Sequence, residues 1–278
     1  MAAATTLEAR WITARRARIY PRIFAVVLGL SALAWVLAAD GWVDRFGKPI
    51  GSDFINVYAA GLMVLDGNPA GAYDFARHGA VERAVLGDGI AGYYGWHYPP
   101  MLLGVAALLA LFSYPVALGA WMAATFAGYA AVMARMAPGR DALWAAVAFP
   151  AVFANLGHGQ NGFLTAALFG GGLLLLDRRP VLAGVLLGLL TYKPQFGLLV
   201  PLALALGGCW RAFAAAAGTA CALAAASWAC FGTDTWLAFA DSVPKTSRVV
   251  LEQGAAGFEK LQSVYAAARL WGAGHGPA

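Results

Sequence analysis

The chain has 278 residues, of which 61% are hydrophobic and only 12% are charged. Soluble domains carry about 25% charged residues, so this composition excludes an ordinary soluble protein and predicts a polytopic helical membrane protein. The net charge of +5 does not indicate a nucleic-acid partner, because the basic residues are scattered at the ends of apolar segments, where they act as topology signals.

The first apolar segment, residues 23–39, follows an arginine-rich leader over residues 1–22. No small-x-small cleavage pattern follows this segment, which predicts a retained first helix with a cytoplasmic N-terminus. A long polar loop, residues 40–98, comes next. It contains "GSDF" (51–54), after which we expect an amphipathic helix from Ile55 to Leu65.

Seven more apolar runs follow this loop. They cover residues 101–112, 115–134, 142–156, 163–176, 181–192, 196–207 and 212–231. If every run crossed the membrane, Arg135 and Arg178 would face outward, against the positive-inside rule. If the segment 99–113 is instead interfacial or re-entrant, both arginines face the cytoplasm. We therefore expect about seven transmembrane helices in a domain over residues 23–231.

An extracytoplasmic tail is then expected over residues 232–278, with short helices near 234–242 and 258–271. The same topology places three polar segments on the outer side of the membrane. They are the loop 40–98, "GHGQNG" (157–162) and "YKPQ" (192–195). Function is therefore expected on the outer face of the helical bundle.

Asp53 is the first candidate for chemistry on that face. An Asp ahead of a helix is often an N-cap that satisfies free backbone amides. A cap also holds its carboxylate in a fixed place, so a structural role and a chemical role are compatible. Position alone does not decide between the two interpretations.

Lys193 and Gln195 stand where an apolar helix meets Pro194. An ionisable residue at membrane depth is costly and is by default a functional hypothesis. The alternative is a lysine whose ammonium group reaches the outer interface. The sequence supports both interpretations equally.

Other polar side chains on the outer side have both structural and binding interpretations. His158, Gln160 and Asn161 either satisfy backbone at a helix break or bind a hydroxyl-rich ligand. Tyr98 fits an interfacial aromatic belt. Lys245 and Arg248 are suited to an anionic phosphate, although solvated surface charges are the simpler explanation.

The sequence lacks several familiar signatures, namely a Walker loop, a dinucleotide fingerprint, HExxH and GxSxG. No acid pair has an obvious metal-binding spacing, so we expect neither a metal nor a cofactor. Gly184 and Gly188 form a Gly-x-x-x-Gly pair suited to close helix contact. We interpret Cys209, Cys221 and Cys230 as small core residues.

The order of several motifs resembles glycosyltransferase family 87, over residues of about 50–265. The motifs are "SDF", "HYPPMLL", "GHGQNGFLTAAL" and "RRPVLAGVLLGLLTYKPQFGLLVPLAL". The "HGQ" turn and the "LLTYKPQ" segment, in this order, are the most specific parts. The resemblance implies a multipass GT-C helical bundle with its active site on the extracytoplasmic face of a bacterial plasma membrane.

The resemblance also implies a reaction, in which a hexose, mannose above all, moves from a polyprenyl-phosphate donor to a lipid or glycan hydroxyl with inversion. Asp53 would be the general base. Lys193 is the first candidate to stabilise the leaving phosphate, with His158, Lys245 and Arg248 behind it. Gln160, Asn161, Gln195 and Tyr98 would bind the substrates.

One feature departs from the family pattern. Family members continue with further membrane helices beyond "LQSVYAAARLWG" (261–272), whereas this sequence ends at Ala278. Two alternatives to an active enzyme follow: an inactive, truncated homologue, or a non-enzymatic transporter or binding protein. A transporter is expected to show paired halves with broken helices at matching positions, and the sequence shows no such internal symmetry.

Overall fold

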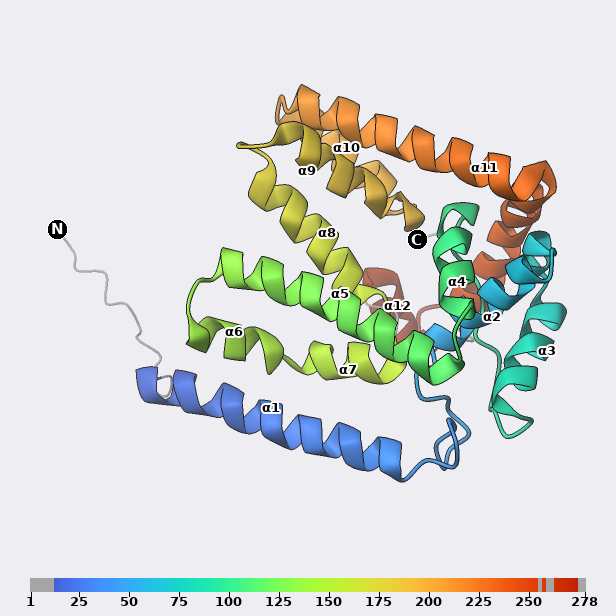
Figure 1. Ribbon diagram of the computed structural model, residues 1–278, viewed down its shortest axis with the longest axis horizontal. Helices are drawn as coiled ribbons and strands as arrows, with labels where there is room; N and C mark the ends of the chain where they lie inside the picture. Colours follow the sequence, from blue (N-terminus) through green and yellow to red (C-terminus); the bar gives the residue numbers. More distant parts are fainter. Residues whose placement is uncertain (1–12, 255–256, 259–262, 275–278) are drawn as a thin grey trace.

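The computed structural model describes residues 13–254, 257–258 and 263–274 of the chain (Figure 1). These residues form helices and only isolated β-bridges, which confirms the all-α class. The α-helices are α1 Ala14–Leu37, α2 Phe54–Leu65, α3 Phe75–Leu86, α4 Leu103–Ala110, α5 Tyr114–Met136, α6 Arg140–Val147, α7 Pro150–His158, α8 Gly162–Leu175, α9 Pro180–Leu189, α10 Phe196–Leu206, α11 Trp210–Ser247 and α12 Val264–Leu270. The 3-10 segments are η1 Pro69–Tyr73, η2 Pro100–Leu102 and η3 Leu190–Tyr192, and a π-helical turn, η4, covers Arg248–Glu252.

Three of these helices, α1, α5 and α11, are long and apolar enough to cross a membrane. At 1.5 Å per residue, the 23 residues of α5 extend about 35 Å, against a hydrocarbon core of about 30 Å. α8, α9 and α10 are shorter apolar helices. The run expected at 142–156 is divided into α6 and α7, because Pro150 ends one helix and begins the next.

The first helix begins earlier than the sequence predicted. α1 starts at Ala14 rather than near Ile23, so most of the arginines of the basic leader lie within the helix. The backbone N–H of Arg16 donates to the Thr13 hydroxyl at 3.2 Å, which caps the helix start. Arginine is a good helix former, so the basic segment extends the apolar one without a break.

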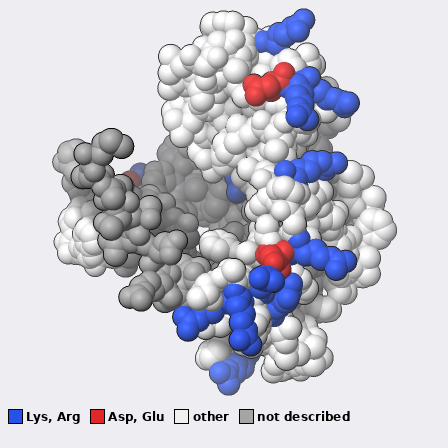
Figure 2. Space-filling view, turned by 90° about the vertical axis from the view of Figure 1, so that its left-hand side faces the viewer, with Lys and Arg blue, Asp and Glu red and all other residues white. Residues whose placement is uncertain are grey.

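The basic turns lie on one face of the molecule, which is the arrangement that the charge pattern predicted. The start of α1 and the turns α5–α6, α8–α9 and α10–α11 lie at the same end of the long helices (Figure 1). Arg135, Arg140, Arg179 and Arg211 belong to these turns. Figure 2 shows Lys and Arg spread over this face, with few acidic side chains between them.

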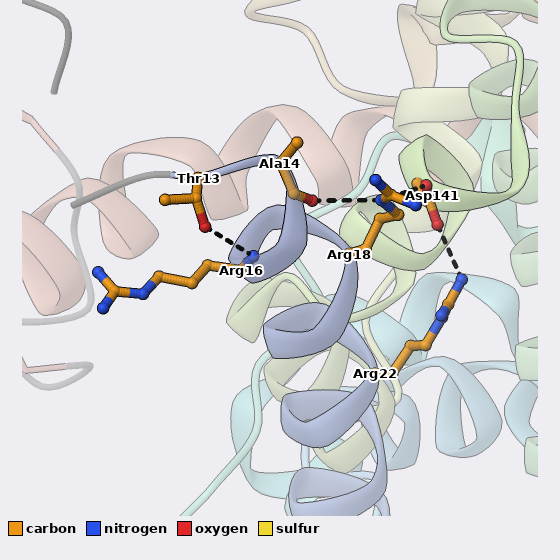
Figure 3. Close-up of polar contacts among 6 residues, drawn as sticks. All are labelled: Thr13, Ala14, Arg16, Arg18, Arg22 and Asp141. Atoms are coloured by element: carbon orange, nitrogen blue, oxygen red, sulfur yellow. Dashed lines mark hydrogen bonds and ion pairs between the residues drawn. The ribbon is translucent and has the colours of Figure 1, made fainter. Parts of the chain in front are cut away.

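An ion pair joins two of these basic segments (Figure 3). The Arg22 guanidinium donates to the Asp141 carboxylate at 2.8 Å, and Arg18 lies 3.9 Å from the same carboxylate. All three side chains are about half exposed, so the pair adds little to stability. Its effect is to hold the start of α1 against the start of α6.

At the opposite end of the molecule, α2 and α4 pack closely against each other. α2 was expected to be amphipathic, but nine of its twelve residues are buried, so this prediction is wrong. A Cβ at Gly61 would lie 2.1 Å from the Ala106 carbonyl oxygen, which shows how closely the two backbones approach. The eight residues of α4 extend about 12 Å, too short to cross the membrane alone.

The predicted glycine pair lies at the contact between α9 and α11. A Cβ at Gly184 would lie 2.2 Å from the Ala212 carbonyl oxygen, and one at Gly188 would lie 2.6 Å from that of Ala216. The two helices therefore meet through their backbones. This is the contact that small-x-x-x-small patterns form in membranes.

We expect Gly184→Val to destabilise the protein by about 3 kcal/mol or more, because the backbone of α11 cannot move away without losing its packing. Gly218→Ala is the matched control on α11, since a Cβ at Gly218 would meet nothing within 4 Å. It should raise the melting temperature slightly, because Ala favours helix. Thermal unfolding in detergent measures both, and equal melting temperatures for the two variants would contradict the packing argument.

Large apolar side chains cover the outside of the helices. Leu198, Leu202 and Leu206 on α10 are between 54% and 81% exposed. Cys221 and Cys230 are also exposed on α11, so the prediction that they are core residues is wrong. Lipid tails are as apolar as a protein core, so an exposed apolar side chain carries no penalty there.

The chain bends at Gly232, whose φ of +77° interrupts α11. The second half of α11 then packs over η1 and η2, where the Tyr73 and Phe239 ring centroids lie 5.7 Å apart. The helix expected near 234–242 is therefore part of α11. Of the helix expected at 258–271, α12 covers 264–270, and residues 259–262 lie outside the described residues.

Candidate functional site

The "GHGQNG" turn between α7 and α8 packs directly onto the start of α2. Gly51 N–H donates to the Gly157 carbonyl at 3.0 Å, and Asp53 N–H donates to the His158 carbonyl at 2.7 Å. Gly159 has a φ of +65°, and a Cβ there would lie 2.6 Å from that of Phe54. Only glycine allows both this conformation and this approach.

Asp53 lies at the N-cap position of α2, but its side chain makes no capping hydrogen bond. Its Oδ2 instead accepts from the Gln160 amide at 2.5 Å. Within the described part of the chain, Oδ1 has no hydrogen-bond partner. The carboxylate is therefore held from one side by a residue 107 positions away and remains available on the other.

A second contact joins the same two segments. The Ser52 hydroxyl lies 2.7 Å from Nδ1 of His158. The turn itself is held by buried Asn155, whose side-chain amide donates to the Gln160 carbonyl at 3.1 Å. The positions of His158 and Gln160 are thus fixed by backbone and side-chain bonds together.

Lys193 follows η3 and is partly buried next to this site. Burial lowers the pKa of the Lys193 ammonium, and the nearby Asp53 carboxylate partly offsets the effect. The ammonium lies 6.0 Å from the centre of the Tyr192 ring, at the edge of a cation–π contact. The Asp53 carboxylate at the start of α2 and the Lys193 ammonium after η3 therefore interact electrostatically.

Tyr98 lies between these segments. The Asn161 side chain donates to the Tyr98 hydroxyl at 2.7 Å, and burial raises the pKa of this phenol well above its usual range. The Tyr98 and Tyr192 ring centroids are 6.2 Å apart, and the Tyr192 hydroxyl lies 2.8 Å from that of Thr165. These contacts join the segment of Tyr98 to the start of α8 and to η3.

The remaining candidate residues lie at the margin of the site around Asp53. Gln195 is exposed at the start of α10. Lys245 and Arg248 are exposed near the end of α11, and neither forms a hydrogen bond or ion pair with Asp53 or Gln160 within the described residues. Between them, the Thr246 hydroxyl contacts Nδ1 of His97 at 3.1 Å.

Residues 96–278 match glycosyltransferase family 87. The chain belongs to this family. No curated protein and no solved structure matches the chain. A glycosyltransferase of family 87 that is built from apolar helices is a membrane enzyme.

The family 87 match includes Tyr98, the "GHGQNG" turn and Lys193, whereas Asp53 precedes it. Ser52, Thr165 and Tyr192 also belong to this cluster, although the sequence did not single them out. Ser52 and Tyr192 are direct neighbours of predicted site residues. No group of three His, Cys, Asp or Glu side chains suited to a metal occurs among the described residues.

A second group of ionisable residues lies behind the site. His78 and Glu82 on α3 are fully buried, with His78 Nε2 3.6 Å from Glu82 Oε1. Burial lowers the pKa of His78 to about 4 and raises that of Glu82 to about 8. Because both shifts disfavour charge, we interpret the pair as neutral near pH 7 rather than as an ion pair.

Proposed function

We propose that this family 87 member transfers a hexose, with mannose as first choice, from a polyprenyl-phosphate donor to an acceptor hydroxyl on the extracytoplasmic face. The observation that carries this proposal is the Asp53 carboxylate, held by Gln160 on one oxygen and open on the other. A general base must reach the proton that it removes, and an open oxygen at a polar surface can do so.

In this reaction the acceptor oxygen attacks the anomeric carbon while Asp53 takes its proton. The bond from the anomeric carbon to the phosphate oxygen breaks, and polyprenyl phosphate leaves with the electron pair. Attack from the face opposite the leaving group inverts the anomeric configuration. Lys193 stabilises the charge that develops on the phosphate, because a partly buried cation acts more strongly than an exposed one.

Purified protein in liposomes with labelled polyprenyl-phosphate mannose tests this function. Transfer is expected from this donor and not from a nucleotide sugar. Lys193→Met should reduce kcat by about 10- to 100-fold through loss of phosphate stabilisation. Lys48→Met, in the loop 40–98 and exposed, is the control and should keep parental activity. Transfer from the nucleotide sugar alone would refute the proposal.

A further inference from the structure

An apolar cavity of about 530 Å³ lies among α1, α5, α6 and α7. Its walls include Val26 of α1, Ala123 and Phe126 of α5, and Val152 and Leu156 of α7. This volume is within the range of about 300–1,000 Å³ that small-molecule sites occupy. α1 and α5 are long and apolar enough to span a membrane, where a cavity between them would face lipid.

The cavity leads toward the polar site along a single helix. Leu156 lines the cavity near the end of α7, and the same chain segment continues into His158 and Gln160. This side of the lining comes from Trp144 and Val147 of α6 and from Val152, Phe153 and Leu156 of α7, two helices that are separated at Pro150.

The cavity lies on the side of the base and not on the side of Lys193. α1, α6 and α7 form one side of the molecule, and α9, α10 and α11 form the other (Figure 1). Asp53 is bonded to the turn after α7, whereas Lys193 connects α9 to α10. An inverting displacement places the acceptor and the leaving phosphate on opposite faces of the anomeric carbon, so their tails depart on opposite sides.

We infer that this cavity holds the acyl chain of a membrane-lipid acceptor, whose headgroup hydroxyl then lies next to Asp53. The assignment of the two sides rests on the proposed function. At the outer end, the Trp35 indole lies close to Gly157 and donates to the Asp44 carboxylate at 3.2 Å. An indole with its N–H toward a polar loop is typical of the membrane interface, where a lipid headgroup would lie.

Photo-crosslinking tests the site without requiring transfer. Asp53→Asn protein in liposomes is irradiated with a dodecyl mannoside that carries a diazirine in its chain. We expect labelled peptides from residues 122–126 and 152–156. Predominant labelling of α10, or labelling of these peptides by a diazirine-bearing isoprenyl phosphate instead, would overturn the inference. If the parent transferred no sugar but its cavity were still labelled, the proposed function would fail while the lipid site would stand.

Transfer kinetics provide the second arm, with octyl and methyl α-mannosides as acceptors. The parent should show a KM for the octyl compound at least about tenfold lower, since each buried methylene contributes to affinity. Ala123→Trp fills the cavity and should abolish this difference while leaving the methyl acceptor unchanged. Ala124→Trp, exposed on the same helix and outside the cavity lining, should keep it. A raised KM for the donor in Ala123→Trp would assign the cavity to the donor tail and refute the inference.

Discussion

Asp53→Asn is expected to lower kcat for sugar transfer by about 100-fold or more, the contribution typical of a positioned general base. Asparagine has nearly the same volume and can still accept the Gln160 hydrogen bond through its amide oxygen. It cannot accept a proton from the acceptor hydroxyl. The KM for the donor should therefore change little, because the variant loses the proton acceptor and retains the shape of the site.

Asp66→Asn is the matched control for this measurement. Asp66 lies at the C-cap of α2, so it is also an aspartate at a boundary of this helix. Its replacement should leave kcat unchanged. Equal melting temperatures for the parent and both variants would show that folding is unaffected. If Asp53→Asn transferred sugar at the parental rate, Asp53 would not be the base, and a different proton acceptor would be required.

The clustering of polar residues was the feature of the site that the sequence predicted best. The positive-inside rule placed Asp53, Gln160 and Lys193 on one side, although they are far apart in the chain. Their direct contacts could not be predicted this way. The Asp53–Gln160 bond depends on Gly159, whose left-handed conformation brings the turn onto α2.

The burial of α2 and α3, within residues 40–98, was the feature that the sequence predicted least well. The sequence predicts an amphipathic helix from Ile55 to Leu65, but α4 covers α2 through the contact at Gly61. His78 and Glu82 stand four residues apart on α3, a spacing common on solvated helices. The packing of α3 against α2, against η1 and against the segment before Tyr98 buries them. Such contacts are set by tertiary structure and not by local pattern.

The buried pair connects to the site through hydrogen bonds. The Tyr94 N–H donates to the Glu82 carboxyl at 3.2 Å, and the Tyr73 hydroxyl donates to the Tyr98 carbonyl at 3.0 Å. His78 Nδ1 lies 3.1 Å from the Ala72 carbonyl. The pair thus contacts η1 through His78 and the segment before Tyr98 through Glu82, so we expect its protonation to affect both segments as well as stability.

The pH dependence of stability follows from the two pKa shifts. Glu82 has a folded pKa of about 8, raised from 4.5, so its contribution is present at low pH and is lost as pH rises toward 8. His78 has a folded pKa of about 4, lowered from 6.5, so its contribution is present above pH 6.5 and is lost as pH falls toward 4. Between about pH 4.5 and 6.5 the two opposite slopes cancel, and above 6.5 only Glu82 acts.

We therefore expect stability to be nearly constant from pH 4.5 to 6.5 and to fall by about 2 kcal/mol between pH 6.5 and 8, at about 1.4 kcal/mol per pKa unit. Glu82→Gln keeps the size and neutrality of the protonated acid, so it should remove this fall and raise the melting temperature at pH 8. Asp88→Asn, exposed in the same loop, should keep the parental profile. Thermal unfolding from pH 5 to 9 measures all three proteins, and a fall of equal size in Glu82→Gln would assign the alkaline loss to another group.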